Sequence, residues 1–171
     1  MARWGFGRKP VDERVHLLLA SAAVTGDKPE TFQVAVYSDN RRARAAVLAA
    51  IAAGPHSHVR IHCIEVATAA DLQRRVSAGG IDLAILDAEA TPVGGLGLTR
   101  QLKDEVVPCP PLVVLIRRTA DDWLARWSQA EGTVRYPVDP VTLAEVVRPL
   151  LFRAAGGPAA ESSDGRGMTS A

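Results

Sequence analysis

The chain has few cysteines, few aromatic residues and no excess of charge of one sign. Its 171 residues include 2 cysteines, 20 Lys or Arg and 19 Asp or Glu, and aromatic residues make up 5%. A formal net charge of +1 supplies no overall field that would attract nucleic acid, so we expect no nucleic-acid partner. Cys63 and Cys109 stand far apart and outside any metal-ligand spacing, which predicts free thiols in a reducing compartment.

Long apolar segments are also missing. No apolar run approaches the roughly 20 residues that a membrane-spanning helix needs. The N-terminus carries Arg3, Arg8 and Lys9 but lacks the apolar core of a signal peptide. We therefore expect a cytoplasmic protein without direct membrane insertion. Peripheral attachment to the cytoplasmic side of the inner membrane, through a protein complex, stays open.

The composition and length that are present suit one globular domain with extensions. Apolar residues make up 47% of the chain and charged residues 23%, which supports an ordinary core. The C-terminal stretch is rich in Ala, Gly and Ser, so burial cannot offset its ordering entropy. The expected segments are a flexible basic and aromatic tail at 1–10, a helix and linker at 11–32, the main domain at 33–153 and a disordered tail at 154–171.

Within the main domain, short apolar runs alternate with helical patterns. Strands are expected at 33–38, 59–66, 81–87, 112–116 and 133–136. Helices are expected at 40–53, 68–78, 96–106, 119–127 and 139–152, with an additional N-terminal helix at 11–24. Strands that are apolar on both faces and separated by helices imply a parallel sheet covered on both sides. The predicted fold is a flavodoxin-like, doubly wound α/β domain with five parallel strands in the order 2-1-3-4-5.

Turn and cap residues mark several helix starts. Thr68 with Asp71, and Thr119 with Asp122, have the spacing of a capping box. Asp139 precedes a proline and is a suitable N-cap for the last helix. In a doubly wound sheet, sites form beyond the carboxyl ends of the strands. Those ends are expected to carry Ser38-Asp39, Asp87, Ile116-Arg117 and Tyr136.

The segment Ile81-Asp-Leu-Ala-Ile-Leu-Asp87, followed by Gly95-Leu96, resembles the signature of response-regulator receiver domains. In that family an aspartate at the end of the third strand accepts a phosphoryl group, and Asp87 matches that position. Pro92 lies one residue later than the family's usual proline, which predicts a different loop path. The resemblance covers Gln33 to about Phe152 and rests on element order and spacing as well as on identity.

Receiver chemistry needs an acceptor carboxylate, further carboxylates for a hard cation such as Mg²⁺, a lysine and a hydroxyl. The resemblance implies that Asp39, Asp87 and the backbone carbonyl of Glu89 would hold Mg²⁺, although a serine replaces one acid of the usual pair. The hydroxyl position falls on Ile116 and the lysine position on Tyr136. The site is therefore interpreted as degenerate, and no cofactor is expected to be required.

Arginines offer a substitute for the lost lysine. Arg117 and Arg135 both lie next to the strand ends, and the sequence does not decide between them. A guanidinium also differs from an ammonium in geometry and reach.

Several of these residues have simpler interpretations. Asp39 is also placed to be a helix N-cap, and Asp87 to be a solvated carboxylate at a strand end. Tyr136 could pack its ring against the sheet with its hydroxyl in water. Trp123 and Trp127, four residues apart, suit core packing and a docking face about equally.

Two other patterns are weak. His56, His58 and His62 surround a turn and lack a fourth ligand at useful spacing, so solvent exposure is favoured over a metal site. The Gly94-Gly95-x-Gly97 run lacks the following Lys-Ser/Thr of a phosphate-binding loop, so it is interpreted as a turn.

The resemblance implies a non-enzymatic regulatory or accessory protein that works by docking to other proteins, independently of phosphorylation. In receivers the fourth helix, fifth strand and fifth helix form the usual output surface, which includes Trp123 and Trp127. The basic segment with Trp4, Phe6 and Arg8 is a candidate peptide anchor, with a passive tail as the equal alternative.

The Ala- and Arg-rich composition further resembles stand-alone receivers of mycobacteria. That resemblance implies the respiratory NADH dehydrogenase complex as a candidate partner. One alternative is a working phosphorelay receiver that a histidine kinase phosphorylates on Asp87. A more distant alternative is a small nucleotide- or flavin-binding enzyme.

Overall fold

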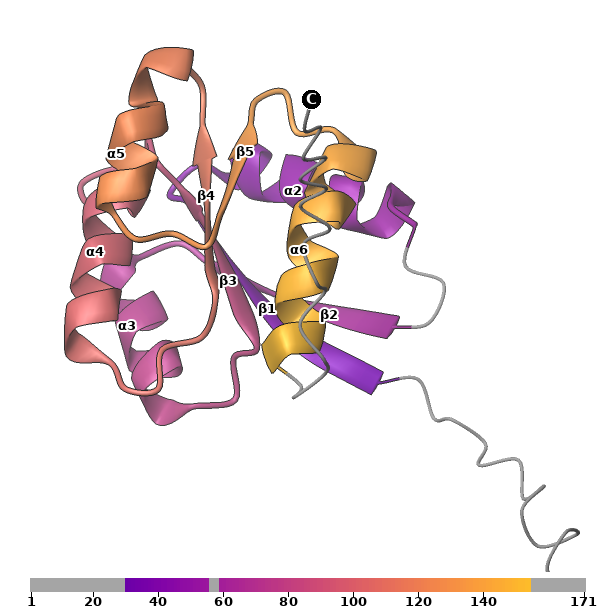
Figure 1. Ribbon diagram of the computed structural model, residues 1–171, viewed down its shortest axis with the longest axis horizontal. Helices are drawn as coiled ribbons and strands as arrows, with labels where there is room; N and C mark the ends of the chain where they lie inside the picture. The colour runs from indigo at the N-terminus through magenta and orange to yellow at the C-terminus, as the bar shows by residue number, and fades with distance from the viewer. Residues whose placement is uncertain (1–29, 56–58, 155–171) are drawn as a thin grey trace, which may run out of the picture.

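A five-stranded parallel sheet forms the centre of the protein (Figure 1). The computed structural model describes residues 30–55 and 59–154. The strands lie in the order β2-β1-β3-β4-β5, as the sequence predicts. Their bounds are β1 Glu30–Tyr37, β2 Val59–Val66, β3 Leu83–Asp87, β4 Leu112–Ile116 and β5 Gly132–Arg135.

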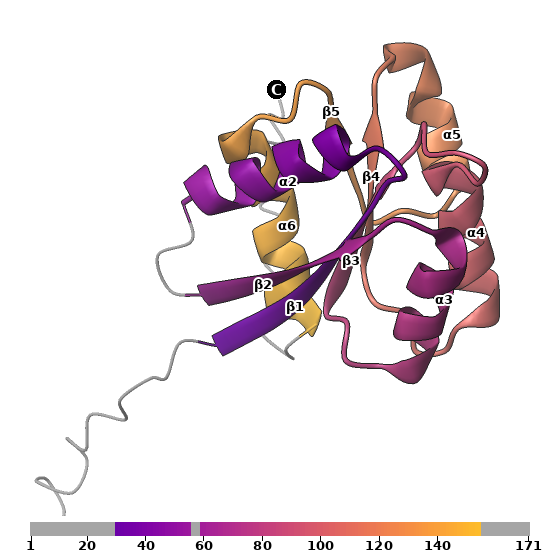
Figure 2. The same ribbon diagram turned by 180° about the vertical axis from the view of Figure 1, so that it is seen from behind.

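Helices cover both faces of the sheet. The views from front and back agree that α2 and α6 pack on one face and that α3, α4 and α5 pack on the other (Figures 1 and 2). A short 3₁₀ turn, η1, leads into α5. The bounds are α2 Arg41–Ala53, α3 Ala69–Ala78, α4 Gly95–Glu105, η1 Thr119–Asp121, α5 Asp122–Trp127 and α6 Pro140–Ala154.

Alternate residues of the central strands supply the two cores. In β3, Leu83 and Ile85 point into the cluster beneath α2 and α6, whereas Ala84 and Leu86 point into the cluster beneath α3 and α4. All five residues of β3 are buried, Asp87 among them. Because each fully buried aliphatic side chain contributes about 1.5–3 kcal/mol, the strand is held in register up to its last residue.

Polar caps begin three of the helices. Asn40 caps α2 by accepting from the backbone of Arg42 at 2.9 Å, and Thr68 caps α3 by accepting from Asp71 at 3.3 Å. At the start of α6, the Asp139 carboxylate accepts from both the backbone nitrogen and the hydroxyl of Thr142, each at 2.8 Å. These caps satisfy backbone donors that the helices leave free.

The predicted capping box between Thr119 and Asp122 is wrong. Thr119 lies inside η1, and neither η1 nor α5 has a side-chain cap. The 3₁₀ turn explains the difference, because its tighter winding begins the helix before the cap geometry can form.

The expected alternation of five strands and five helices is confirmed, with small shifts of boundary. β1 begins at Glu30, ahead of the expected start at Gln33, because β2 pairs with it along its full length. β5 ends at Arg135 rather than at Tyr136. The expected N-terminal helix at 11–24 and both predicted tails lie outside the described residues, except that α6 includes Ala154. Among the helices of the described ranges, none has the length and apolar character needed to cross a membrane.

Candidate functional site

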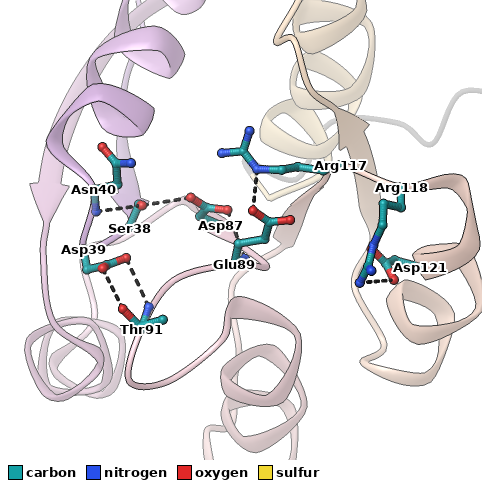
Figure 3. Close-up of polar contacts among 9 residues, drawn as sticks. All are labelled: Ser38, Asp39, Asn40, Asp87, Glu89, Thr91, Arg117, Arg118 and Asp121. Atoms are coloured by element: carbon teal, nitrogen blue, oxygen red, sulfur yellow. Dashed lines mark hydrogen bonds and ion pairs between the residues drawn. The ribbon is translucent and has the colours of Figure 1, made fainter.

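The carboxyl ends of β1, β3 and β4 bring the candidate residues to one edge of the sheet. Tyr37 is paired with Leu86, and Asp87 is paired with Leu115. Because the strands are parallel and in this register, the residues that follow β1 and β4 flank Asp87. Figure 3 shows Ser38 on one side of Asp87 and the Glu89–Arg117 pair on the other.

The Asp87 carboxylate is buried and already holds two hydrogen bonds. Asp87 is only 2% exposed, so its interpretation as a solvated carboxylate is wrong. The hydroxyl of Ser38 donates to Asp87 Oδ2 at 2.9 Å, and the backbone of Glu89 donates to Oδ1 at 3.1 Å. Ser38 in turn accepts from the backbone of Asn40 at 3.1 Å. A buried carboxylate needs such donors to offset its lost hydration.

Gly95 lets α4 start directly against Asp87. A Cβ at this position would lie 2.5 Å from the carbonyl oxygen of Asp87 and 2.7 Å from its carbonyl carbon. Backbone atoms cannot yield as a flexible side chain can. The glycine noted in the sequence is therefore required by the close packing of helix and strand.

Asp39 does not cap α2, and that predicted alternative is wrong because Asn40 is the cap. Its carboxylate instead crosses to the loop after β3, where Thr91 donates through its backbone nitrogen at 3.1 Å and its hydroxyl at 2.8 Å (Figure 3). The Thr91 hydroxyl is the first cause of a lowered pKa for Asp39, with the Thr91 backbone second. Asp39 is therefore held in its charged form by Thr91.

Arg44 is a site residue that sequence reasoning missed. Its guanidinium donates to the carbonyl oxygen of Ser38 at 2.7 Å and to that of Asp39 at 3.3 Å. It also pairs with Glu65 of β2 at 3.0 Å. The helical spacing that puts Arg44 one turn after Asn40 was the available signal. Arg44 thus fixes the backbone of the loop that presents Ser38.

The two degenerate switch positions lack the groups expected there, since Ile116 supplies no hydroxyl and Tyr136 supplies no positive charge. Ile116 is 0% exposed and belongs to the apolar cluster that includes Val114 and Ala125. Tyr136 is half-buried, and within the described residues its hydroxyl has no hydrogen-bond partner. The interpretation that this hydroxyl sits in water is therefore wrong. Burial, followed by the charge of Asp87, raises the pKa of Tyr136 to about 12.

Arg117, rather than Arg135, is the cation at this site. Its guanidinium lies 4.2 Å from the ring centroid of Tyr136 and pairs with Glu89. Arg135 instead pairs with Asp122 at the start of α5. Arg117 thus bridges the loop after β3 to the residue after β5, in a cation–π arrangement.

The residues present do not fit a divalent cation in the arrangement that the resemblance implies. Both oxygens of Asp39 accept from Thr91, and both oxygens of Asp87 accept from donors of the chain. Where the family has a second acidic residue beside Asp39, this chain has Ser38. Its hydroxyl donates a hydrogen bond to Asp87. Across residues 30–55 and 59–154, no three His, Cys, Asp or Glu side chains form a group that could hold a metal ion.

The side chains of Trp123 and Trp127 lie on the surface. They are 63% and 52% exposed, so of the two alternatives that the sequence left open, core packing is wrong for both. Beside α5 there is a hollow of about 430 Å³ between α5, β5 and α6. It is lined by Asp122, Thr133, Arg135, Tyr136, Pro137, Asp139 and Thr142. The hollow reaches α5 at Asp122, and neither tryptophan lines it. Exposed tryptophans are typical of protein interfaces.

The remaining candidates take no part in this site. His62 is exposed and shares a hydrogen bond of 2.7 Å with Gln33, while His56 and His58 lie outside the described residues. Cys63 and Cys109 are free and partly buried, and burial raises the pKa of each thiol. Trp4, Phe6 and Arg8 also lie outside the described residues.

Comparisons with known proteins agree with this geometry. The chain is 47% identical over 126 residues to an uncharacterized response regulatory protein of Mycobacterium tuberculosis, found in strains CDC 1551 and H37Rv. That match covers 73% of this chain and 95% of the relative. No protein-family model matches the chain.

Solved structures show the same fold at low sequence identity. A CheY-like receiver domain protein of Methanospirillum hungatei gives a TM-score of 0.58 at 14% identity and covers 74% of this chain and 98% of its own. A putative response regulator of Chloroflexus aurantiacus gives 0.61 at 12% identity and covers 71% and 98%. The shared architecture is thus that of receiver domains.

Proposed function

The chain belongs to the response regulator family, and its described part has the fold of a receiver domain. On that premise we propose that it is a docking module that works without phosphorylation. The observation that carries this proposal is the Ser38–Asp87 hydrogen bond at 2.9 Å. A serine takes the place of a metal-binding acid and donates to the acceptor carboxylate itself. The carboxylate is thereby held as a structural group of the buried strand end.

The neighbouring positions support the same proposal. A receiver that senses a phosphoryl group needs a positive charge and a hydroxyl beside the acceptor. Tyr136 takes the lysine position and supplies no positive charge, and Ile116 takes the hydroxyl position and supplies no hydrogen bond. Arg117 is committed to Glu89 and to the Tyr136 ring. We propose no catalytic activity and no required cofactor for this domain.

The proposed docking face is the surface of α5 together with the adjacent hollow. Trp123 and Trp127 provide exposed, rigid aromatic area, which is the type of side chain that contributes most to binding energy at interfaces. The nearby Arg135–Asp122 pair supplies a polar rim. The partner is proposed to be a protein. The N-terminal residues Trp4 and Phe6 are a proposed second anchor.

The respiratory NADH dehydrogenase complex is the candidate partner, proposed from the resemblance to mycobacterial stand-alone receivers. A relative at 47% identity in Mycobacterium tuberculosis supports the mycobacterial part of that proposal. Docking to such a complex would hold the chain at the cytoplasmic side of the membrane. The complex should then contain the chain at a fixed stoichiometry after mild detergent extraction, and absence of the chain would contradict this choice of partner.

The docking proposal is tested by affinity purification of the tagged full chain from its own cells. With the double variant Trp123→Ala/Trp127→Ala, the amount of partner recovered is expected to fall more than tenfold, because interface tryptophans often contribute over 2 kcal/mol each. Asp87→Asn is expected to keep it. Val107→Ala is a matched control, since Val107 is 91% exposed and lies outside the proposed face. Loss of the partner in Asp87→Asn, or its equal recovery with the tryptophan variant, would contradict the proposal.

A working phosphorelay receiver is the second candidate function. The retained position of Asp87 at the end of β3, with Gly95 packed against it, is the observation that favours it. In that case a histidine kinase would be the partner, and Asp87 would accept a phosphoryl group in the presence of Mg²⁺.

A further inference from the structure

The loop between β3 and α4, residues 88–94, is tied to the sheet by three side-chain contacts from two other strand ends. Thr91 donates twice to Asp39, which follows β1. The hydroxyl of Tyr37, at the end of β1, donates to the carbonyl oxygen of Val93 at 2.7 Å. Arg117, which follows β4, pairs with Glu89. The loop is thus fastened near its start, in its middle and near its end.

Two of these contacts have a well-defined geometry for identifiable reasons. Tyr37 is 1% exposed, so its hydroxyl is held in place by the core around its ring and cannot rotate away from Val93. The Asp39–Thr91 contact is charge-assisted and uses both carboxylate oxygens, which fixes its geometry, and both residues are exposed to solvent. Both join residues more than 50 positions apart in sequence.

A divalent cation at this edge would compete with the same groups. It would need the oxygens of Asp39, which the backbone and hydroxyl of Thr91 already use. Mg²⁺ demands near-ideal octahedral oxygen geometry, and the chain offers Ser38 where a second acid would be required. A cation would therefore have to share the Asp39 oxygens with Thr91, and it would find an incomplete ligand set.

We infer that Asp39 and Thr91 form a latch that takes the structural place of a cation, so that the loop at 88–94 is held in one conformation without divalent metal. This inference rests on the proposed function, because a domain that works without phosphorylation must hold this strand-end loop without the metal that phosphoryl transfer uses. Tyr37 and Arg117 are the two supporting positioning residues. The family's cation site has thereby become a hydrogen-bonded link between β1 and the loop after β3.

The test is hydrogen exchange, measured by mass spectrometry on peptides covering residues 88–94 of the full chain. The wild type should exchange at the same rate in excess EDTA and in millimolar MgCl₂. Thr91→Val should exchange severalfold faster, because this exposed contact loses its hydroxyl bond to the Asp39 carboxylate. Thr91→Ser keeps the hydroxyl and should match the wild type.

Thr142→Val is the matched control, because Thr142 makes the same pair of bonds to Asp139 at a different place. It should leave exchange at 88–94 unchanged. Slower exchange of the wild-type loop in MgCl₂ would overturn the latch, as would equal exchange of Thr91→Val and wild type, or of Thr91→Ser and Thr91→Val. The proposed function fails separately, if Asp87 accepts a phosphoryl group.

Discussion

The hydroxyl of Ser38 donates a hydrogen bond of 2.9 Å to the carboxylate of Asp87, and both residues are almost fully buried. This pair joins the ends of β1 and β3 inside the core. Its burial means that each partner depends on the other, because a lone buried carboxylate or hydroxyl would lose its hydration without replacement. Asp87 takes the position of the family's phosphoryl acceptor, and Ser38 takes the position of one of its metal-binding acids.

Removing the Ser38 hydroxyl should therefore destabilise the fold. Ser38→Ala leaves Asp87 with one donor fewer, and hydrogen bonds to buried charged groups contribute about 1.5–3 kcal/mol. We expect the free energy of unfolding in urea to fall by that amount. Ser77→Ala is the control, since Ser77 lies exposed in α3 and should change stability by less than about 0.5 kcal/mol. Equal stability of the two variants would contradict a structural role for the Ser38–Asp87 pair.

Two glycines of α4 should respond in opposite directions to alanine. Gly95→Ala places a Cβ 2.5 Å from the carbonyl oxygen of Asp87 and should cost about 1–3 kcal/mol through overpacking. Gly97→Ala meets nothing within 4 Å and should stabilise the helix by up to about 1 kcal/mol. Thermal unfolding of both variants measures this difference. A neutral Gly95→Ala would show that α4 can move away from Asp87.

Both tyrosines should resist ionisation in the folded protein. Burial, followed by the charges of Asp39 and Asp87, raises the pKa of Tyr37, and burial with the charge of Asp87 raises the pKa of Tyr136 to about 12. In the unfolded chain, tyrosine side chains ionise near pH 10. The contribution of the two neutral tyrosines to the free energy of unfolding is thus fully present below about pH 10 and is lost as pH rises through their pKa values in the folded protein. Stability should therefore fall from pH 10 towards 12.

Phenolate absorbance during an alkaline titration measures this effect. The chain contains 2 tyrosines, so Tyr136→Phe leaves the titration of Tyr37 alone and identifies the step near pH 12. The same variant removes a buried hydroxyl that has no partner among the described residues, and should not lower stability. Half-ionised tyrosine at pH 10 in the native protein would contradict the burial of these two hydroxyls.

Most of the fold follows from local patterns in the sequence. β4 was predicted to the residue because Leu112–Ile116 is a continuous apolar run bounded by prolines and arginines. β2 was predicted to the residue as well. The early start of β1 was missed because Glu30 and Thr31 are held by pairing to β2, which is a tertiary effect that strand propensity does not contain.

The site was only partly predictable. The position of Asp87 at a strand end followed from the sheet order, and the substitution by Tyr136 was visible in the sequence. The partner of Asp39 was not, because Thr91 lies 52 positions away and a threonine in a loop carries no signal of what it contacts. The exposure of Trp123 was also undecided, since α5 has only 6 residues and is too short for its pattern to define a buried face.

The most direct test of the account is intact-mass analysis of the purified full chain with Mg²⁺ and acetyl phosphate, beside an Asp87→Asn control. The account predicts that neither protein gains a phosphoryl adduct, because Asp87 is bound by Ser38 and the cation of this site, Arg117, is paired with Glu89. A phosphoryl adduct on the wild type that is absent from Asp87→Asn would contradict it, and would establish the domain as a working receiver.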